Sequence, residues 1–323
     1  MTEGEAAAVD MKVEFKALDD SGLNITREQL AEVFRPFVAQ SSDTDDSLWR
    51  AEVQRRQRKI RRGYLKRLMF GWLPSTQRRE SAVIEEYSKA WQPDEYDKYH
   101  LGQPLARVSP WEWGEQKLLA SDVGATRFRQ LLLIRVVERL RPRTVLEVGC
   151  GNGVNLMLLA CRFPDIAFSG VELTQQGHTA ALEFQKHAQL PVAMQQYAPL
   201  ELSDTTAFRR IRFIQGSAAA LPFADKSFDL VITVLALEQM ERIREQALHE
   251  IARVAGQHLF NIEPFRDLND SGGSRRNVVR RNYFRGRIGD LERHGFSPIL
   301  ALRDFPQEVF LKAGAVLSRR QGR

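Results

Sequence analysis

The stretch Thr144-Val-Leu-Glu-Val-Gly-Cys-Gly-Asn-Gly-Val154 decides how this chain folds. It starts as a short apolar run, is interrupted by the carboxylate of Glu147, and ends in three alternating glycines. An apolar segment with helical spacing follows at once, from Asn155 to Cys161. This order predicts a buried parallel strand, a tight turn and the start of a helix. The glycines let the backbone turn sharply and let a ligand approach it, and the N–H groups at the helix start favour a carboxylate or phosphate.

The composition around this stretch is that of a globular chain. The 323 residues are 43% hydrophobic and 27% charged, with a formal net charge of +6, which allows one large domain plus an extension, or two domains. The two cysteines, Cys150 and Cys161, form no disulfide framework or CxxC site, so a reducing, cytoplasmic location and no metal site are expected. No secretory signal or transmembrane segment is apparent in the sequence.

Strand and helix patterns alternate after the glycine turn, which predicts βαβ units in a doubly wound α/β fold with a mostly parallel sheet. The last two strands are expected to form an antiparallel hairpin. A polar loop is predicted at 267–281, and the two tryptophans of 111–113 are expected in a short loop. The strands are predicted at 144–148, 166–172, 211–214, 227–235, 258–263, 297–305 and 309–319, and the main helices at 122–140, 174–190, 242–255 and 283–295.

The N-terminal third is predicted to be a mainly helical, basic extension, residues 1–100, ahead of a domain at 101–323. A capping box at Thr26 starts a helix over 26–40, a loop follows at 40–46, and another helix is expected at 81–91. Between them, residues 47–70 form a basic helix with an imperfect apolar face. The basic helix either packs on the domain with its arginines in solvent, which we favour, or meets a membrane surface, RNA or an acidic partner.

The glycine stretch does not match the usual phosphate-binding motifs. The sixth position of a dinucleotide fingerprint is Val154, and no GKS or GKT is present. Instead, residues 147–153 resemble the E/DxGxGxG motif of class I S-adenosylmethionine-dependent methyltransferases. Glu172 matches the acidic residue that ends the second strand in that family. Leu221-Pro-Phe223, Ser227-Phe-Asp229 and Leu248–Val254 resemble segments of its small-molecule, type 11 subgroup. The resemblance covers roughly 122–323.

The resemblance implies a Rossmann-like fold with a seven-stranded sheet and an S-adenosylmethionine site. Backbone N–H groups around Gly149 and Gly151 would receive the methionine carboxylate. Glu147 would reach the methionine amine, Glu172 would accept the ribose hydroxyls, and Ser217, which replaces a common Asp, would border the adenine. The cofactor-binding residues implied are Glu147, Gly149, Cys150, Gly151, Gly153, Asn155, Glu172, Leu173, Ser217, Ala218 and Leu235.

The implied reaction is in-line methyl transfer to a small organic or lipid-like acceptor. The enzyme then mainly positions a nucleophile and excludes water, and a base is needed only if the nucleophile loses a proton. Glu238, Glu263 and Tyr283 are candidates, although positioning or structural roles are favoured for each. Arginines in 275–281 suit an anionic acceptor or are simply solvated. The alternatives are an RNA or protein methyltransferase that docks through the basic helix at 50–67, and a non-catalytic binding module on the same fold.

Overall fold

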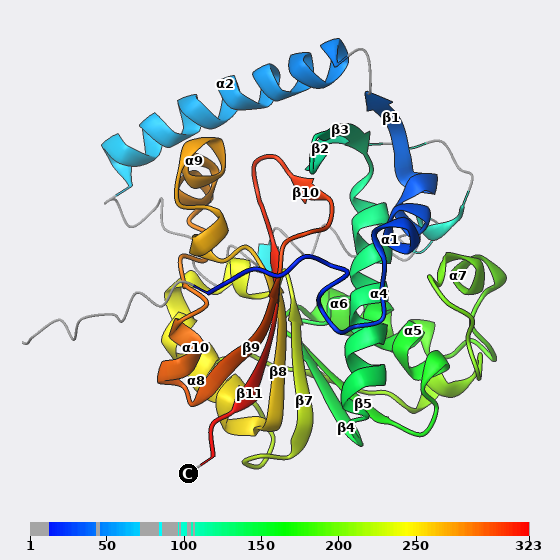
Figure 1. Ribbon diagram of the computed structural model, residues 1–323. Helices are drawn as coiled ribbons and strands as arrows, with labels where there is room; N and C mark the ends of the chain where they lie inside the picture. The colour runs from blue at the N-terminus through cyan, green and yellow to red at the C-terminus, as the bar shows by residue number, and fades with distance from the viewer. Residues whose placement is uncertain are drawn as a thin grey trace, which may run out of the picture.

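A computed structural model describes residues 13–42, 46–71, 84–85, 96, 98–101, 105 and 107–322. Figure 1 shows one open sheet covered by helices, with a long helix, α2 (Ser47–Phe70), lying across one end of it. Most of the helix predicted at 81–91 lies outside the described residues.

The main sheet has seven strands in the order β6-β5-β4-β7-β8-β11-β9, which confirms the predicted doubly wound fold. β11 runs antiparallel to both of its neighbours, as expected for the final hairpin. The chain crosses from β4 to β5 on one side and returns to β7 on the other, so the switch point lies between β4 and β7. The strands are β4 (Thr144–Val148), β5 (Ala167–Glu172), β6 (Arg212–Gln215), β7 (Phe228–Val234), β8 (Ala255–Glu263), β9 (Phe296–Leu302) and β11 (Gly314–Arg320).

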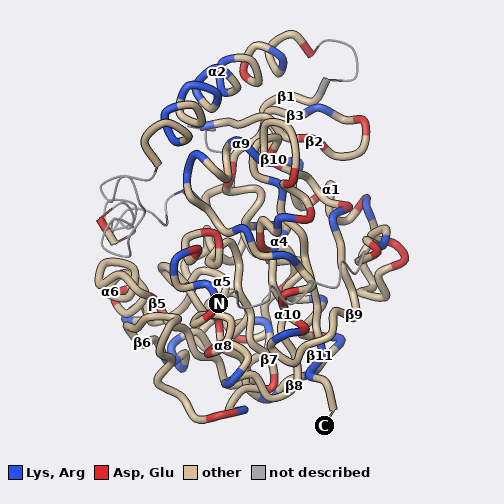
Figure 2. The backbone as a smooth tube through the Cα atoms, turned by 90° about the vertical axis from the view of Figure 1, so that its left-hand side faces the viewer, with Lys and Arg blue, Asp and Glu red and all other residues tan. Residues whose placement is uncertain are grey.

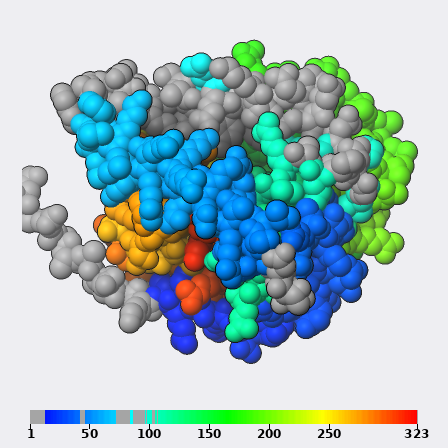
Figure 3. Space-filling view, turned by 90° about the horizontal axis from the view of Figure 1, so that it is seen from above, coloured from blue at the N-terminus to red at the C-terminus, as the bar shows by residue number. Residues whose placement is uncertain are grey.

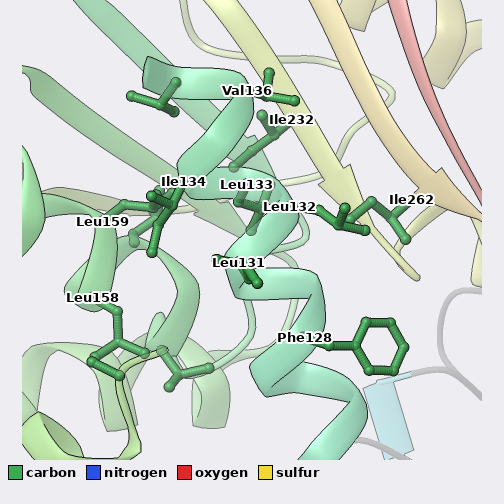
Figure 4. Packing of buried hydrophobic residues seen from close by; sticks show 14 of the residues in the cluster. Phe128, Leu131, Leu132, Leu133, Ile134, Val136, Leu158, Leu159, Ile232 and Ile262 are labelled. Carbon is green, nitrogen blue, oxygen red and sulfur yellow. The ribbon is translucent and has the colours of Figure 1, made fainter. Parts of the chain in front are cut away.

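Alternating side chains of the central strands supply two hydrophobic cores. Val145 and Ile232 face the core that contains α4 (Asp122–Leu140), whereas Leu146 and Val231 face the core on the other side of the sheet. Figure 4 shows Leu132 and Leu133 of α4 beside Ile232 and Ile262 of the sheet. The remaining helices around the sheet are α5 (Val154–Arg162), α6 (Gln175–Phe184), α7 (Val192–Tyr197), α8 (Arg244–Val254) and α10 (Asp290–Arg293).

A second, four-stranded sheet joins the N-terminal region to the rest, and the sequence did not reveal it. Helix α1 (Arg27–Phe34) begins at the predicted capping box but ends before Pro36, and the chain then enters β1 instead of continuing to residue 40. The two tryptophans predicted in a loop lie in β2, which pairs with β3. The strands are β1 (Val38–Ser42), β2 (Ser109–Trp113), β3 (Gln116–Ala120) and β10 (Gln307–Glu308), in the order β1-β3-β2-β10.

The segment after β8 also differs from the prediction. Residues 272–281, expected in a loop because they are polar and rich in glycine and arginine, form helix α9 (Gly272–Arg281). The helix expected at 283–295 is reduced to the short α10. Tertiary packing accounts for this change, because α9 lies against α2 and buries Val278 and Asn277. Figure 3 shows α2 in light blue directly beside α9 in orange.

Candidate functional site

The glycine turn after β4 has the backbone shape that the sequence predicts. Gly149, Gly151 and Gly153 all have positive φ, of 77°, 56° and 80°. At Gly149 a Cβ would lie 2.6 Å from the Cβ of Ala236, so the turn also approaches the loop after β7 too closely for a side chain. A Cβ on Gly153 would lie 2.6 Å from the ring of Phe213, which makes this glycine a packing requirement.

The backbone N–H groups of the turn already have acceptors within the fold. Gly149 and Cys150 donate to the carbonyl of Val171 at 2.8 and 3.1 Å, and Gly153 donates to the carbonyl of Cys150 at 2.9 Å. Gly151 donates to the carboxylate of Glu172 at 3.0 Å. In this structure the N–H groups of Gly149, Cys150 and Gly151 hold the turn itself. The expectation that N–H groups around Gly149 and Gly151 receive the methionine carboxylate stays a prediction.

Glu147 lies at the end of β4 and is 1% exposed. Its Oε1 accepts a hydrogen bond from Asn155 Nδ2 at 2.7 Å, whereas its Oε2 is buried with no hydrogen-bond partner. Burial raises the pKa of this carboxyl to about 8, because the charged form loses its hydration, and the charge of Glu172 adds to the rise. A buried acceptor without a partner is costly, and a ligand ammonium group would satisfy it.

Asn152, in the middle of the glycine turn, provides a hydrogen-bond donor that complements the acceptor on Glu147. Its side chain is 2% exposed, and its Nδ2 is buried with no hydrogen-bond partner. Its carbonyl accepts a hydrogen bond from the Tyr96 hydroxyl at 2.8 Å, which fixes the turn. The turn thus offers one open acceptor, on Glu147, and one open donor, on Asn152, at the same cavity.

Glu172 is held by the protein through both of its carboxylate oxygens. Oε2 accepts from the Gly151 N–H, and Oε1 accepts from the backbone and hydroxyl of Thr174 at 2.8 and 2.6 Å. This carboxylate therefore supports the glycine turn and holds Thr174, whose own hydroxyl caps α6 by accepting from the Gly177 N–H at 3.1 Å. Oε2 keeps one further lone pair, and the predicted contact with a ribose hydroxyl stays a prediction.

A cavity of about 330 Å³ opens at the carboxyl ends of β4, β5 and β7. Two of the predicted cofactor residues, Gly153 and Ser217, do not line it; Ser217 Oγ instead accepts from the Ala219 N–H at 3.2 Å. The other predicted residues do line it, and these are Glu147, Gly149, Cys150, Gly151, Asn155, Glu172, Leu173, Ala218 and Leu235.

Several other residues line the same cavity, and no sequence pattern pointed to most of them. Lys98 and Tyr99 come from the segment predicted as a domain boundary, and Thr126 and Arg129 come from helix α4. The neighbouring Tyr96 stacks on Phe184 with ring centroids 4.1 Å apart. Only Asn152 had a signal in the sequence, since it lies inside the glycine motif.

A second, larger cavity of about 660 Å³ adjoins the first. Arg129, Leu235 and Glu238 line both cavities and therefore mark their junction. Leu235 has φ +52°, a left-handed backbone conformation that costs energy in any residue with a Cβ. Such conformations are typical of functional sites. Arg129 has a buried Nε with no hydrogen-bond partner in the described part of the chain. Burial lowers the pKa of its guanidinium, and Asp122, Glu238 and Glu263 oppose that shift.

The three candidate catalytic residues occupy different places. Glu238 lies in the short 3-10 helix Leu237–Gln239 at the junction, is 6% exposed, and accepts from Gln239 Nε2 at 2.6 Å. Tyr283 lines the larger cavity, and its hydroxyl accepts from Arg281 at 2.8 Å. Glu263 lines neither cavity and accepts the N–H groups of Ala236 and Leu237 at 3.0 and 3.2 Å. Among the three, only Glu238 lies between the cavities.

Two of the segments that resemble the type 11 subgroup, Leu221–Phe223 and Leu248–Val254, have a structural role and not a catalytic one. Arg253 of α8 donates to the carbonyls of Leu221 and Phe223 at 3.0 and 2.8 Å, and it pairs with Glu250 at 2.7 Å. Glu250 in turn accepts the Leu221 N–H at 2.8 Å. This pair fixes the turn that leads into β7 and so helps to position Leu235, which directly follows that strand.

Comparison with known proteins agrees with this geometry. Residues 146–258, from the middle of β4 into β8, match the model of a family described as a methyltransferase domain of type 11. This segment is similar to the type 11 methyltransferase domain family. The matched segment contains the glycine turn, both carboxylates, and the loop that carries Glu238.

Two curated relatives each match part of the chain. A demethylmenaquinone methyltransferase of Porphyromonas gingivalis is 28% identical over 131 residues, which is 41% of this chain and 46% of that protein. A fatty-acid O-methyltransferase of Mycolicibacterium smegmatis is 33% identical over 112 residues, 35% of this chain and 33% of that protein. The matches thus span less than half the length of either relative.

A solved structure with a similar arrangement is an S-adenosylmethionine-dependent methyltransferase from Methanosarcina mazei. It is 13% identical, with a TM-score of 0.41, and the alignment covers 58% of this chain and 98% of that one. In addition, no helix among the described residues is long and apolar enough to cross a membrane.

Proposed function

We propose that this protein transfers a methyl group from S-adenosylmethionine to a small organic acceptor. The observation that carries the proposal is the pair of unsatisfied polar groups at the glycine turn. Among the described residues, Glu147 Oε2 has no donor and Asn152 Nδ2 has no acceptor, and both residues line the smaller cavity. An amino acid zwitterion supplies one ammonium and one carboxylate, so the methionine part of the cofactor fits these two groups.

The remaining residues of the smaller cavity suit the rest of that cofactor. Glu172 Oε2 has one lone pair left for a ribose hydroxyl, and Leu173, Ala218 and Ile243 offer apolar surface for a flat base. When bound, S-adenosylmethionine supplies a methyl group on a positively charged sulfur. The protein then has to hold an acceptor in line with that group and keep water away.

The second cavity is the place for the acceptor, because it meets the first at Arg129, Leu235 and Glu238. Glu238 lies where a nucleophile would lose its proton, so we assign it to orient the acceptor or accept that proton. Glu263 acts indirectly, because its hydrogen bonds with the N–H groups of Ala236 and Leu237 fix the loop that carries Glu238.

Two measurements test the proposal. Calorimetric titration with S-adenosylhomocysteine should show binding at one site, and absence of binding would refute the assignment of the smaller cavity. Incubation with radiolabelled S-adenosylmethionine and a fractionated cell extract should then transfer label to a small molecule. Binding without transfer to any fraction would instead favour a non-catalytic binding module.

A second candidate keeps the chemistry but takes RNA as the acceptor. It is favoured by the exposed cations Arg58, Arg61 and Arg62, which lie on α2 outside the larger cavity. Figure 2 shows how often Lys and Arg recur along this helix. This candidate predicts that label becomes sensitive to nuclease and that binding weakens steeply as salt rises.

A further inference from the structure

The walls of the larger cavity are strongly cationic. Among the described residues, seven lysine and arginine side chains line it against three carboxyl groups, which are Asp122, Glu238 and Glu308. The cations come from parts of the chain that are far apart in sequence and meet only in the fold. They are Arg55, Arg56 and Lys59 of α2, Arg107, Arg129 of α4, and Arg280 and Arg281 of α9.

Only part of this positive charge is balanced by the protein. Arg55 and Arg56 each pair with Glu52 at 2.7 Å, and Arg56 also reaches Glu308 at 3.3 Å. In the part of the chain that the structure describes, Lys59 and Arg280 form no ion pair. Cations that are crowded into a cavity without counter-charges repel one another, and a bound anion relieves that repulsion.

Arg280 shows the imbalance most clearly. Its Nη2 donates to Asn277 Oδ1 at 2.8 Å, but its Nε is buried with no hydrogen-bond partner. Burial and the charge of Arg281 both lower the pKa of its guanidinium. Its stem passes over Gly63 of α2, where a Cβ would overlap the Arg280 side chain. The two helices therefore approach closely and bring Arg280 and Lys59 to one cavity.

These cations lie on the far side of the junction between the two cavities, and this position indicates which part of an acceptor they would bind. Arg129 and Leu235 separate the cationic cavity from the cavity with the glycine turn. An anionic group held by α2 and α9 would leave the opposite end of the same molecule at Glu238, beside the first cavity. Several guanidinium groups in excess suit a multiply charged phosphate better than a single carboxylate.

We infer that the acceptor is a phosphate-bearing small molecule whose anionic group binds between α2 and α9, on Lys59 and Arg280. This inference rests on the proposed methyl transfer. It also gives the basic helix α2 a function, because α2 forms one wall of the acceptor cavity. The phosphate belongs either to a free metabolite or to the headgroup of a lipid.

The first experiment measures binding of inorganic pyrophosphate to the full chain saturated with S-adenosylhomocysteine. The variant Lys59→Gln/Arg280→Gln should bind pyrophosphate at least tenfold more weakly than wild type. The matched control Lys66→Gln/Arg276→Gln changes the same charges on the same helices but away from the cavity, and should bind like wild type. No pyrophosphate binding by wild type, or equal loss in both variants, would overturn the inference.

Affinity for S-adenosylhomocysteine is measured separately in each variant. It should be unchanged, which shows that the variants are folded and that the two cavities bind independently. A chain that binds pyrophosphate but no S-adenosylhomocysteine would refute the proposed methyl transfer while leaving the anion site in place. The reverse result would refute the anionic acceptor and leave the methyl transfer in place.

The second experiment uses radiolabelled S-adenosylmethionine with a protein-free cell extract. The labelled product should be retained on an anion exchanger and should lose that retention after phosphatase treatment. Label in the aqueous phase identifies a free metabolite, and label in the chloroform phase identifies a lipid. A neutral product, or one that nuclease degrades, would contradict the inference.

Discussion

Asn155 donates a hydrogen bond of 2.7 Å to one carboxylate oxygen of Glu147, and the other oxygen of Glu147 is buried without a partner. This asymmetry orients the carboxyl toward the cavity and leaves one acceptor for a ligand. Burial also raises its pKa to about 8, so the group is mostly protonated at neutral pH before a ligand arrives.

We therefore expect cofactor binding to release a proton. An ammonium group favours the charged form of Glu147 and lowers its pKa, so affinity for S-adenosylhomocysteine should rise from pH 6 to about 7.5. Above that it should level off, because Glu147 then becomes charged in the unliganded protein as well. Calorimetry in buffers of different ionisation enthalpy measures the released proton directly, and a proton count of zero at pH 7 would contradict the assignment.

Glu147→Gln tests the same contact by mutation. The amide presents N–H groups to the ligand ammonium or gives up the bond to Asn155, so a charge-assisted hydrogen bond worth about 1.5–3 kcal/mol is lost. Affinity should fall about tenfold to a hundredfold, and the proton release should disappear. Glu201→Gln, on an exposed side chain, is the control and should behave like wild type.

Gly149→Ala should disrupt the turn because the new Cβ meets the Cβ of Ala236 at 2.6 Å, in a backbone conformation with φ +77°. We expect a loss of about 1–3 kcal/mol in the free energy of unfolding, together with weaker cofactor binding. Adding Ala236→Gly removes the steric clash but not the backbone strain. The double variant should therefore recover part of the loss in denaturant titrations, whereas strictly additive effects would show that the two positions do not clash.

Glu263 should make stability depend on pH. Burial raises its pKa to about 8, so the folded state holds a proton that the unfolded chain gives up near its ordinary pKa of 4.5. The stabilisation is complete below about pH 4.5 and is lost as pH rises toward about 8. Glu263→Gln keeps an oxygen for the N–H groups of Ala236 and Leu237 and should flatten urea-derived stability between pH 5 and pH 8. Parallel pH profiles for wild type and variant would rule out this role.

Arg253→Leu should act on stability and not on the site directly. It removes hydrogen bonds to the carbonyls of Leu221 and Phe223 and the ion pair with Glu250. We expect a loss of about 1–3 kcal/mol in the free energy of unfolding, with weaker cofactor binding only through displacement of the turn before β7. Arg209→Leu is the comparison, since Arg209 is exposed. An Arg253 variant as stable as wild type would show that the pair does not hold this turn.

The sequence predicted the sheet well because its signals are local. The apolar strands, the glycine turn and the final hairpin depend on neighbouring residues, and the structure confirms them. The loop predicted at 267–281 was wrong because its polar composition hid a helix that is stabilised by contact with α2. Likewise, nothing local showed that the tryptophans of β2 would lie in a sheet with β3, or that β3 would pair with β1 from the N-terminal third.

For the site, the sequence by itself determined which residues surround the glycine turn, since turn geometry and the carboxylates at 147 and 172 follow from a short, ordered motif. Only the tertiary structure decided how those groups are used. It bound Glu172 to the glycine turn through Oε2 and to Thr174 through Oε1. It also left Glu147 Oε2 and Asn152 Nδ2 without a partner among the described residues, and it brought cations from α2 and α9 to one cavity. Which polar groups find a hydrogen-bond partner, and which charges lie close together, depends on distances between segments that are far apart in the chain. A local sequence pattern does not contain these distances.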